Sequence, residues 1–396
     1  MINRQKSALV ADFVQYNELE ALMIGDFRIG IMGTGAIAST MAKTIKGTKG
    51  VTNYAVGSRD ISRAQAFAKD NGVKKAYGSY GELVNDPKVN LIYVATPHSE
   101  HFDNVKLAIS AGKPVLCEKA FMLNEQQASM IFKYADEKGV FVSEAMWTRF
   151  MPLRTKLDEI LASHVIGDPT MLTANLSYNI AWKQRIQDPS LGGGALLDLG
   201  VYCLNFASMV FGNDVSDISS ICTYNANGMD MQDSITLRYP TGQMAVLNAS
   251  ANSASDRRGV IYGTKGYIVV DNINNYESIT VYDADHNKIG FYKRPKQVTG
   301  YEYEVISSVK AIKEGWKECP EMPHSESLKI MNMMDFIRKN LGISFPGEPK
   351  SSFENIGKGN ITDVTSSDAS TDPAETVSEA TQEETQERQT ENEQAQ

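Results

Sequence analysis

Hydrophobic runs alternate with amphipathic stretches through the first third of the chain. The hydrophobic runs predict strands at 27–32, 51–57, 91–96, 115–117 and 140–143. Between them, apolar residues recur at helical spacing and predict helices at 36–46, 61–71, 99–111 and 124–138. Short strands that alternate with helices of this length are typical of βαβ units, so this part of the chain predicts a parallel sheet.

The second half of the chain has a different pattern. Its β-type runs lie at 169–178, 217–224, 234–239, 244–251, 259–262 and 267–270. Turn-forming residues such as Pro240-Thr241-Gly242 separate these runs, which favours a mostly antiparallel sheet. Helices are expected at about 151–162, 195–211, 301–315 and 325–341. We therefore predict an α/β protein, in which a parallel-sheet domain precedes an α+β domain with an open-faced antiparallel sheet.

Both ends of the chain differ in composition from the middle. Residues 351–396 hold eleven acidic and two basic residues, which accounts for the whole net charge of −9 and leaves the rest neutral. Because they have almost no large apolar side chains, we expect 350–396 to be a disordered acidic tail. Residues 1–24 form an N-terminal extension, on the hypothesis that Met23 is the natural start. The two domains then span 25–146 and 147–349.

Composition excludes several classes of protein. A neutral folded part gives no support for nucleic-acid binding. The apolar runs fall short of the roughly 18 residues that span a bilayer, so no membrane partner is expected, and Asp12 interrupts any signal-peptide pattern. The four cysteines lack C-x-x-C spacing and the five histidines lack zinc spacing, so we expect reduced thiols and no metal site. Together these features predict a cytoplasmic protein.

A glycine-rich loop follows the first strand. It reads Gly33-Thr34-Gly35-Ala36-Ile37-Ala38, a G-x-G-x-x-A sequence between a strand and a helix. Gly33 permits the tight turn, Gly35 lets the backbone approach a pyrophosphate, and Ala38 allows close packing of helix on strand. The helix N-terminus then presents free N–H groups to the phosphates. We expect residues 33–37 to bind a dinucleotide, which makes the first domain a Rossmann domain.

The end of the second strand bears on which dinucleotide binds. NAD sites place an acidic residue about 20 positions past the loop, where it accepts a hydrogen bond from the ribose 2′-hydroxyl. Here Ser58 occupies that place, Arg59 follows it, and Arg63 lies one helical turn later. A guanidinium group pairs well with a 2′-phosphate, so NADP is favoured over NAD. Asp60 would reverse this preference if its carboxylate pointed at the ribose.

Farther along the chain, Gly192-Gly193-Gly194 precedes a stretch of helical pattern that carries two polar residues. Asp198 and Tyr202 are four residues apart, so a helix would place them on one face. Two interpretations stay open from these residues alone. Either the pair relays a proton, or it belongs to a buried helix and only satisfies backbone groups.

Four segments in order resemble the glucose–fructose oxidoreductase/inositol dehydrogenase/MocA (Gfo/Idh/MocA) family, over about residues 25–349. They are the loop at 33–38, Ala95-Thr96-Pro97-His98-Ser99-Glu100-His101, Cys117-Glu118-Lys119, and the segment from Gly192 to Tyr202. Segments 144–152 and 322–328 resemble the branch of dimeric dihydrodiol dehydrogenases and NADP-linked D-xylose 1-dehydrogenases. This resemblance implies an NAD(P)-dependent dehydrogenase that moves hydride between nicotinamide and a secondary or hemiacetal alcohol of a sugar, cyclitol or trans-dihydrodiol.

The resemblance also implies roles for single residues. It makes Tyr202 the proton acceptor, Lys119 the group that positions the hydroxyl and favours the phenolate, and Asp198 their orienting partner; Lys119 and Tyr202 could exchange roles. Further family positions near the cofactor fall on Thr96, Pro97, His101 and Glu118. Trp147 and Arg149 are expected to line the substrate pocket.

Ala120 departs from the family pattern, which has proline after the lysine. A cis peptide before a residue other than proline costs about 3–4 kcal/mol, so we expect a trans peptide between Lys119 and Ala120.

Two other functions fit the same sequence. One is an enzyme that keeps its cofactor bound and passes hydride between two sugars or cleaves a glycoside. The other is a non-catalytic NADP-binding sensor or repressor, against which the presence of Lys119, Asp198 and Tyr202 together argues. Because family members commonly bury the open sheet face between subunits, the resemblance also implies a homodimer or a larger homo-oligomer.

Overall fold

The computed structural model describes residues 26–348, which lie in one compact unit. The predictions for the 1–24 extension, for Met23 and for the 350–396 tail fall outside the described residues.

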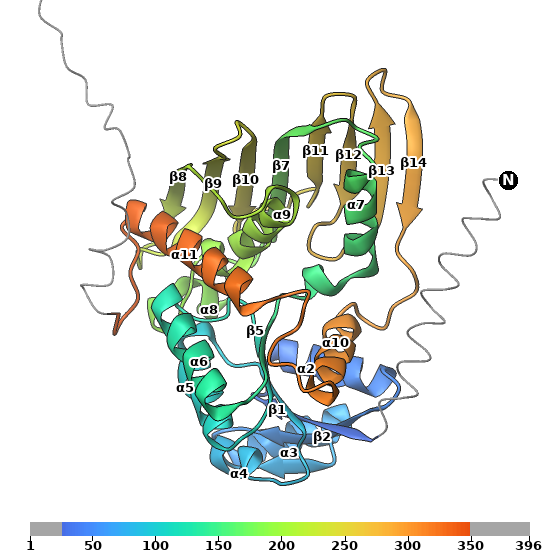
Figure 1. Cartoon of the computed structure of the whole chain (residues 1–396). Helices are drawn as coiled ribbons and strands as arrows, with labels where there is room; N and C mark the ends of the chain where they lie inside the picture. The colour runs from blue at the N-terminus through green and yellow to red at the C-terminus, as the bar shows by residue number, and fades with distance from the viewer. Residues whose placement is uncertain (1–25, 349–396) are drawn as a thin grey trace, which may run out of the picture. The chain divides into compact units, whose positions relative to one another are not determined.

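The first half of the described chain forms a parallel six-stranded sheet with the order β3-β2-β1-β4-β5-β6 (Figure 1). Its strands are β1 Phe27–Met32, β2 Val51–Gly57, β3 Lys75–Tyr77, β4 Leu91–Val94, β5 Val115–Glu118 and β6 Val142–Ala145. The helices are α2 Ala36–Gly47, α3 Ile61–Asn71, α4 Tyr80–Val84, α5 His98–Ser110 and α6 Glu125–Lys138. This strand order is that of the Rossmann fold, with its topological switch point between β1 and β4. The predicted parallel sheet is confirmed.

The second half forms an eight-stranded sheet with the order β14-β13-β12-β11-β7-β10-β9-β8. Its strands are β7 Pro169–Ser177, β8 Asp217–Tyr224, β9 Asp230–Arg238, β10 Met244–Ser250, β11 Gly259–Gly263, β12 Gly266–Asp271, β13 Ser278–Asp283 and β14 Lys288–Lys293. Neighbouring strands are antiparallel except for β7 and β10, which pair in parallel. The expected antiparallel character is therefore confirmed, with one parallel pair at the centre.

One face of this second sheet is covered by helices. A π-helical turn, η3 (Leu196–Gly200), leads into α9 (Val201–Phe211), which packs on β7 and β10, while α7 (Pro152–Ala162) packs on β13. Alternation along β7 explains this arrangement, because Leu172, Ala174 and Leu176 are buried under the helices. The other face carries Met171 and its neighbours at period two, which are exposed or half-buried. In the view of Figure 1, α7 and α9 lie in front of the strands.

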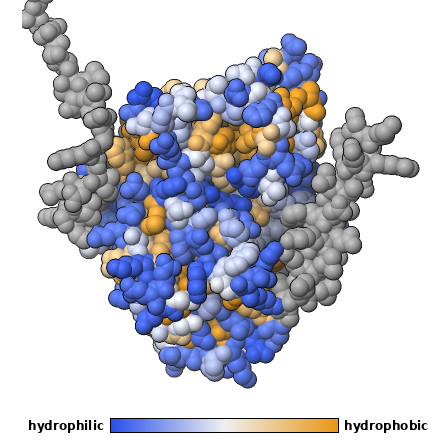
Figure 2. Space-filling view, viewed as in Figure 1, coloured by the Kyte–Doolittle hydropathy of each residue, from blue (hydrophilic) through white to orange (hydrophobic). Residues whose placement is uncertain are grey.

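Two further helices connect the halves. α10 (Glu302–Lys313) packs against α2 and against η1 (Trp147–Phe150), and α11 (His324–Asn340) packs against α6 and α9. The surface on this side of the molecule is mainly hydrophilic, and its largest hydrophobic areas lie over the second sheet (Figure 2).

One helical stretch in the described residues, Pro189–Phe211, is long and apolar enough to cross a membrane. It comprises η2 (Pro189–Leu191), η3 and α9, and 83% of its most apolar window is buried inside the protein. Since η3 and α9 contact the second sheet, their apolar side chains belong to the core beneath it.

Candidate active site

The glycine-rich loop has the geometry of a phosphate-binding turn. Gly33 has a φ of +114°, and a Cβ there would stand 2.7 Å from the carbonyl oxygen of Ala95. A Cβ on Gly35 would meet no heavy atom within 4 Å, so open space lies over the loop. Helix α2 begins at Ala36 with no side chain capping its first turn, which leaves backbone N–H groups for a ligand. These residues fit the pyrophosphate of a dinucleotide.

At the end of β2, Asp60 serves the backbone of its own helix. Its carboxylate accepts hydrogen bonds from the Ser62 backbone N–H at 2.8 Å and from the Ser62 hydroxyl at 2.6 Å, and these bonds lower the pKa of Asp60. The Asp60 backbone N–H in turn donates to Ser58 Oγ. Arg59 and Arg63 are both exposed beside this turn.

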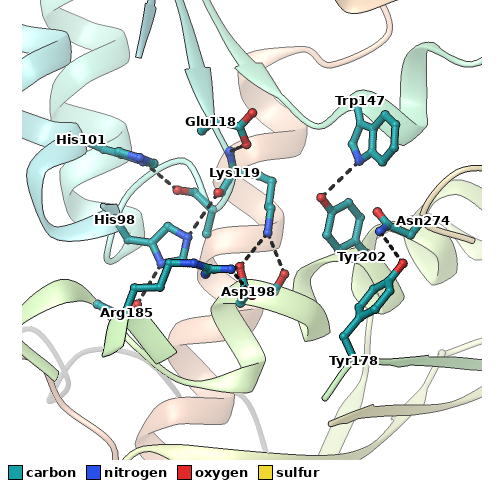
Figure 3. A network of polar contacts seen from close by, with 12 residues as sticks. His98, His101, Glu118, Lys119, Trp147, Tyr178, Arg185, Asp198, Tyr202 and Asn274 are labelled. Carbon is teal, nitrogen blue, oxygen red and sulfur yellow. Dashed lines mark hydrogen bonds and ion pairs between the residues drawn. The ribbon is translucent and has the colours of Figure 1, made fainter. Parts of the chain in front are cut away.

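Lys119 and Asp198 form the centre of a polar cluster (Figure 3). Lys119 follows β5, and its Nζ donates to Asp198 Oδ1 at 3.0 Å and to the Asp198 carbonyl oxygen at 2.7 Å. Arg185, on the short helix α8 (Gln184–Gln187), reaches the same carboxylate, with Nη1 at 2.8 Å from Oδ1 and Nη2 at 3.0 Å from Oδ2. Although burial opposes ionisation, these two cations hold the pKa of Asp198 well below its usual range.

Tyr202 lies on the other side of Lys119. The Lys119 ammonium stands 4.8 Å from the centre of the Tyr202 ring, and the Tyr202 hydroxyl accepts a hydrogen bond from Trp147 Nε1 at 3.1 Å. Burial, reinforced by Tyr301 and by the carboxylates of Glu118 and Asp198, raises the pKa of Tyr202 well above its ordinary value. Lys119 donates its hydrogen bonds to Asp198 and acts on Tyr202 through its positive charge, so the expectation that it favours the phenolate stays a prediction.

The peptide between Lys119 and Ala120 is cis, so the expected trans peptide is wrong. Two histidines, half-buried His98 and buried His101, contact the carbonyl groups around it. His98 contacts the carbonyl oxygens of Gly192 at 2.8 Å and Lys119 at 3.2 Å, and His101 contacts those of Ala120 at 3.0 Å, Phe121 at 3.1 Å and Thr96 at 2.9 Å. Burial lowers the pKa of both, that of His98 to about 3. Sequence spacing gave no sign of these long-range contacts.

His101 was expected beside the nicotinamide ribose. The structure buries it completely and engages both of its ring nitrogens with backbone carbonyls, so it positions the loop that carries Lys119. Thr96 and Pro97 lie half-buried between β4 and α5, and Thr96 Oγ1 accepts a hydrogen bond from Asn104. Glu118 is buried, accepts a hydrogen bond from the hydroxyl of Tyr93, and has its pKa raised by burial to about 7.

The two predicted pocket residues behave differently. Trp147 stacks on Tyr301 with ring centres 4.0 Å apart, and it contacts Tyr202, so it lies at the cluster. Arg149 instead donates to Asn205 Oδ1, Ser208 Oγ and Glu326 Oε2, which fastens η1 to α9 and α11. These partners of Arg149 lie outside the Lys119–Asp198–Tyr202 group.

Sequence reasoning missed other members of the site. The hydroxyl of Tyr178, at the end of β7, accepts hydrogen bonds from Asn274 at 3.1 Å and from Arg257 at 3.3 Å. Figure 3 shows Tyr178 and Asn274 beside Tyr202. Tyr178 follows a strand, Asn274 lies in a loop and Arg185 lies on the short helix α8, and none of them belongs to a motif.

A buried aspartate fixes the start of the segment that carries Asp198. The Leu196 backbone N–H donates to Asp230 Oδ2 at 2.5 Å. Gly194 has a φ of +101°, and a Cβ there would stand 2.2 Å from Asp230 Oδ1. The last glycine of the triplet is therefore required for the close approach of Asp230.

Neither metal nor disulfide chemistry is assembled in the described part of the chain. Residues 26–348 contain no group of three or more histidine, cysteine, aspartate or glutamate residues that could hold a metal ion. Cys117, Cys203, Cys222 and Cys319 are free thiols.

Comparison with known proteins gives a consistent picture. A family model described as an oxidoreductase family with an NAD-binding Rossmann fold matches residues 27–146, and the GFO/IDH/MocA C-terminal domain matches residues 155–269. The trans-1,2-dihydrobenzene-1,2-diol dehydrogenase of Sus scrofa is 34% identical over 328 residues, covering 81% of this chain and 98% of that protein. The Homo sapiens enzyme of the same name is 32% identical over 331 residues, covering 82% and 99%.

Solved structures share the fold at lower identity. A 3-ketoreductase of Actinomadura kijaniata in complex with NADP and TDP-benzene has a TM-score of 0.73 at 22% identity, covering 80% of this chain and 98% of its own. An aldose-aldose oxidoreductase of Caulobacter crescentus has a TM-score of 0.72 at 18% identity, with the same coverage. From the matched domains and the relatives above 30% identity, the chain belongs to the Gfo/Idh/MocA family of NAD(P)-dependent oxidoreductases.

Proposed function

We propose that this oxidoreductase is an NADP-dependent dehydrogenase whose substrate is a secondary or hemiacetal alcohol of a sugar, or a trans-dihydrodiol. The observation that carries the proposal is the meeting of Lys119, Asp198 and Tyr202, with Lys119 extending from the Rossmann sheet to the helix under the second sheet. The names of the relatives at 32–34% identity support the diol as one candidate substrate.

The chain's own groups divide the proton chemistry. The bound nicotinamide supplies the hydride acceptor in alcohol oxidation. Tyr202 exchanges a proton with the substrate oxygen, and its raised pKa keeps the phenol protonated, ready to donate in the direction of carbonyl reduction. Lys119 places a positive charge beside the phenol, where it stabilises negative charge on the substrate oxygen. Asp198 holds the Lys119 ammonium in place through its side chain and its backbone carbonyl.

The preference for NADP rests on the turn after β2. Asp60 is committed to the N-terminus of α3, and Ser58 takes the place of the acidic residue that binds a ribose 2′-hydroxyl. Exposed Arg59 and Arg63 supply the positive charge that a 2′-phosphate requires.

The function is tested with a panel of aldoses, inositols and trans-1,2-dihydrobenzene-1,2-diol, each offered with NAD and with NADP. Formation of reduced cofactor identifies the substrate class. For the best substrate, Tyr202→Phe and Lys119→Met are expected to lower kcat by about 10²–10⁴-fold, because each removes a group that acts on the transferred proton or its oxygen. Cofactor affinity, measured by fluorescence titration, should change little. Full activity of Tyr202→Phe at every pH would contradict the assignment.

We also propose that the open face of the second sheet forms the contact of a homodimer. Tyr262, Tyr267 and Tyr282 lie side by side across three strands of that face, with Tyr267 and Tyr282 stacked at 4.8 Å between ring centres. Aromatic side chains of this kind are enriched at protein interfaces.

A further inference from the structure

Arg185 is the least expected member of the cluster. It lies on α8, between β7 and η2, and its two terminal nitrogens contact both oxygens of Asp198, at 2.8 and 3.0 Å. Such a bidentate contact fixes the plane of a carboxylate as well as its position. Of the two carboxylate oxygens, Lys119 contacts Oδ1 only, so it meets a carboxylate whose orientation is set by Arg185.

The cluster has more positive than negative charge. Lys119 Nζ and Arg185 Nη1 contact the same oxygen, at 3.0 and 2.8 Å, so two cations share one carboxylate. The other titratable groups that face them are His98 and His101 from α5, Glu118 from β5, Glu144 from β6, Tyr202 from α9, and Tyr301 at the start of α10. Burial lowers the pKa of His98 to about 3 and raises that of Glu118 to about 7, so the imidazole is neutral and Glu118 offsets the excess only in part near neutral pH.

Arg185 also differs from its partners in exposure. Its side chain is 42% exposed, whereas those of Asp198 and Lys119 are 6% and 12% exposed. The guanidinium thus closes the cluster on the solvent side. A substitution there changes charge and orientation without opening the core.

We propose that Arg185 is a positioning residue of the dehydrogenase reaction, which orients Asp198 and gives the site the positive charge that eases removal of the substrate's hydroxyl proton. This inference rests on the proposed function of Lys119, Asp198 and Tyr202. Removing a cation at this distance makes every neighbouring group hold its proton more strongly. The effect has one direction whether Tyr202 or Lys119 accepts the proton.

The first test is the pH profile of kcat/KM for alcohol oxidation. In Arg185→Gln the rising limb is expected to move to higher pH by about one unit, which is the shift that a partly exposed charge produces at this range. Arg185→Lys keeps the positive charge but loses the bidentate contact with Asp198. The rising limb of its pH profile should therefore stay near that of the wild type, while kcat falls. Lys183→Gln is the matched control. Lys183 is a cation at the start of the same helix, α8, and its ammonium lies over the ring of Trp182. It should leave the profile unchanged.

A second measurement needs no substrate. Competitive acetylation by acetic anhydride over a pH series, read at Lys119 by mass spectrometry, reports how strongly this amine holds its proton. The half-reaction point should move to higher pH in Arg185→Gln and stay in place in Arg185→Lys and Lys183→Gln. An unmoved point in Arg185→Gln, or an equal movement in both Arg185 variants, overturns the inference. Failure of the wild type to oxidise any alcohol would instead overturn the proposed function, and the labelling result would still decide the role of Arg185.

Discussion

The proposed preference for NADP rests on a single carboxylate, that of Asp60 after β2. In an NAD site that carboxylate must reach the ribose, but Asp60 accepts two hydrogen bonds from Ser62 at the start of α3. An N-cap hydrogen bond of this kind stabilises a helix by about 1 kcal/mol. Turning the Asp60 carboxylate toward a ribose would lose that stabilisation. In the proposed function, Ser58 and the exposed Arg59 and Arg63 then receive the ribose of NADP.

The double variant Arg59→Ala, Arg63→Ala tests this argument. Hydrogen bonds to charged groups contribute about 1.5–3 kcal/mol each, so every arginine that contacts the 2′-phosphate should weaken NADP binding by about tenfold or more. Affinity for NAD, which lacks the phosphate, should change by less than about twofold. Both dissociation constants can be measured by quenching of intrinsic fluorescence.

Lys69→Ala serves as the control, since Lys69 is an exposed cation in the last turn of the same helix. Equal weakening of NAD and NADP in the double variant would show that the arginines act on the fold of the turn and not on the phosphate.

At the scale of elements, one of two neighbouring buried acids on β9 holds the start of η3. Asp230 accepts the backbone N–H of Leu196, and Asp233 is buried beside it. Burial and the neighbouring Asp230 raise the pKa of Asp233 well above its ordinary value. The pair therefore ionises at a higher pH in the folded chain than in the unfolded chain, and the free energy of unfolding must depend on pH.

Asp233→Asn tests this dependence. In the unfolded chain Asp233 ionises near pH 4, whereas in the folded chain it keeps its proton to a much higher pH. Above about pH 4 the folded state thus binds more protons than the unfolded state, and the free energy of unfolding of the wild type falls as pH rises, by at most about 1.4 kcal/mol per unit. Asparagine cannot ionise, so the variant lacks this loss of stability. The Tm of Asp233→Asn minus the Tm of the wild type should therefore be larger at pH 8 than at pH 5.

Thermal unfolding of both proteins at the two pH values measures this difference. Asp103→Asn, at an exposed position on α5, is the control and should show a constant offset from the wild type. An offset for Asp233→Asn that is also independent of pH would mean that Asp233 is already ionised in the folded protein.

Burial and length explain part of what sequence reasoning found and missed among the elements. Strands such as β1 and β4 are buried along most of their length, so their apolar runs stand out. The elements not predicted are β3, α4, β13, β14 and the short helices α8, η1 and η2. β3 has only three residues with none buried, and β14 is an edge strand whose residues are exposed or half-buried, so neither has a hydrophobic pattern to detect.

The same distinction holds for the site. Asp198 and Tyr202 could be paired from spacing, because a helix brings positions four apart together. The contact of Arg185 with Asp198 could not be predicted from spacing, because it depends on the path of the chain between β7 and η2. The orientation of His101 toward three backbone carbonyls depends likewise on the fold of the Lys119 loop, which is a property of tertiary structure.

At the scale of the molecule, the two sheets are joined by helices whose contacts explain where the site lies. α11 packs on α6 from the first half and on α9 from the second, and α10 packs on α2 and η1. Glu326 of α11 accepts a hydrogen bond from Arg149, which also donates to Asn205 of α9. These contacts fix the position of α9 relative to α11, which packs on the Rossmann half. This packing lets Lys119 of one half reach Asp198 of the other.

The open face of the second sheet carries the last prediction. Met171 and Met244 lie opposite each other on the central parallel pair β7 and β10, and each is 41% exposed. If this face is the dimer contact, the double variant Met171→Glu, Met244→Glu places two charges at its centre, where burial of an unpaired charge costs several kcal/mol per ion. Each protomer contributes both positions to a two-fold interface, so the penalty is doubled. The variant should sediment as a monomer at micromolar concentration.

Met130→Glu is the matched control, since Met130 is an apolar residue on α6 of the Rossmann half and is 53% exposed. It should sediment like the wild type. A wild type that is monomeric, or a double variant that stays dimeric, would rule out this face as the contact. Because Lys119, Asp198, Arg185 and Tyr202 all come from one chain and lie on the helix-covered side of the sheet, the monomeric variant is further expected to keep its cofactor affinity. Cofactor affinity measured on the separated monomer therefore distinguishes a dimer that stabilises the fold from one that completes the site.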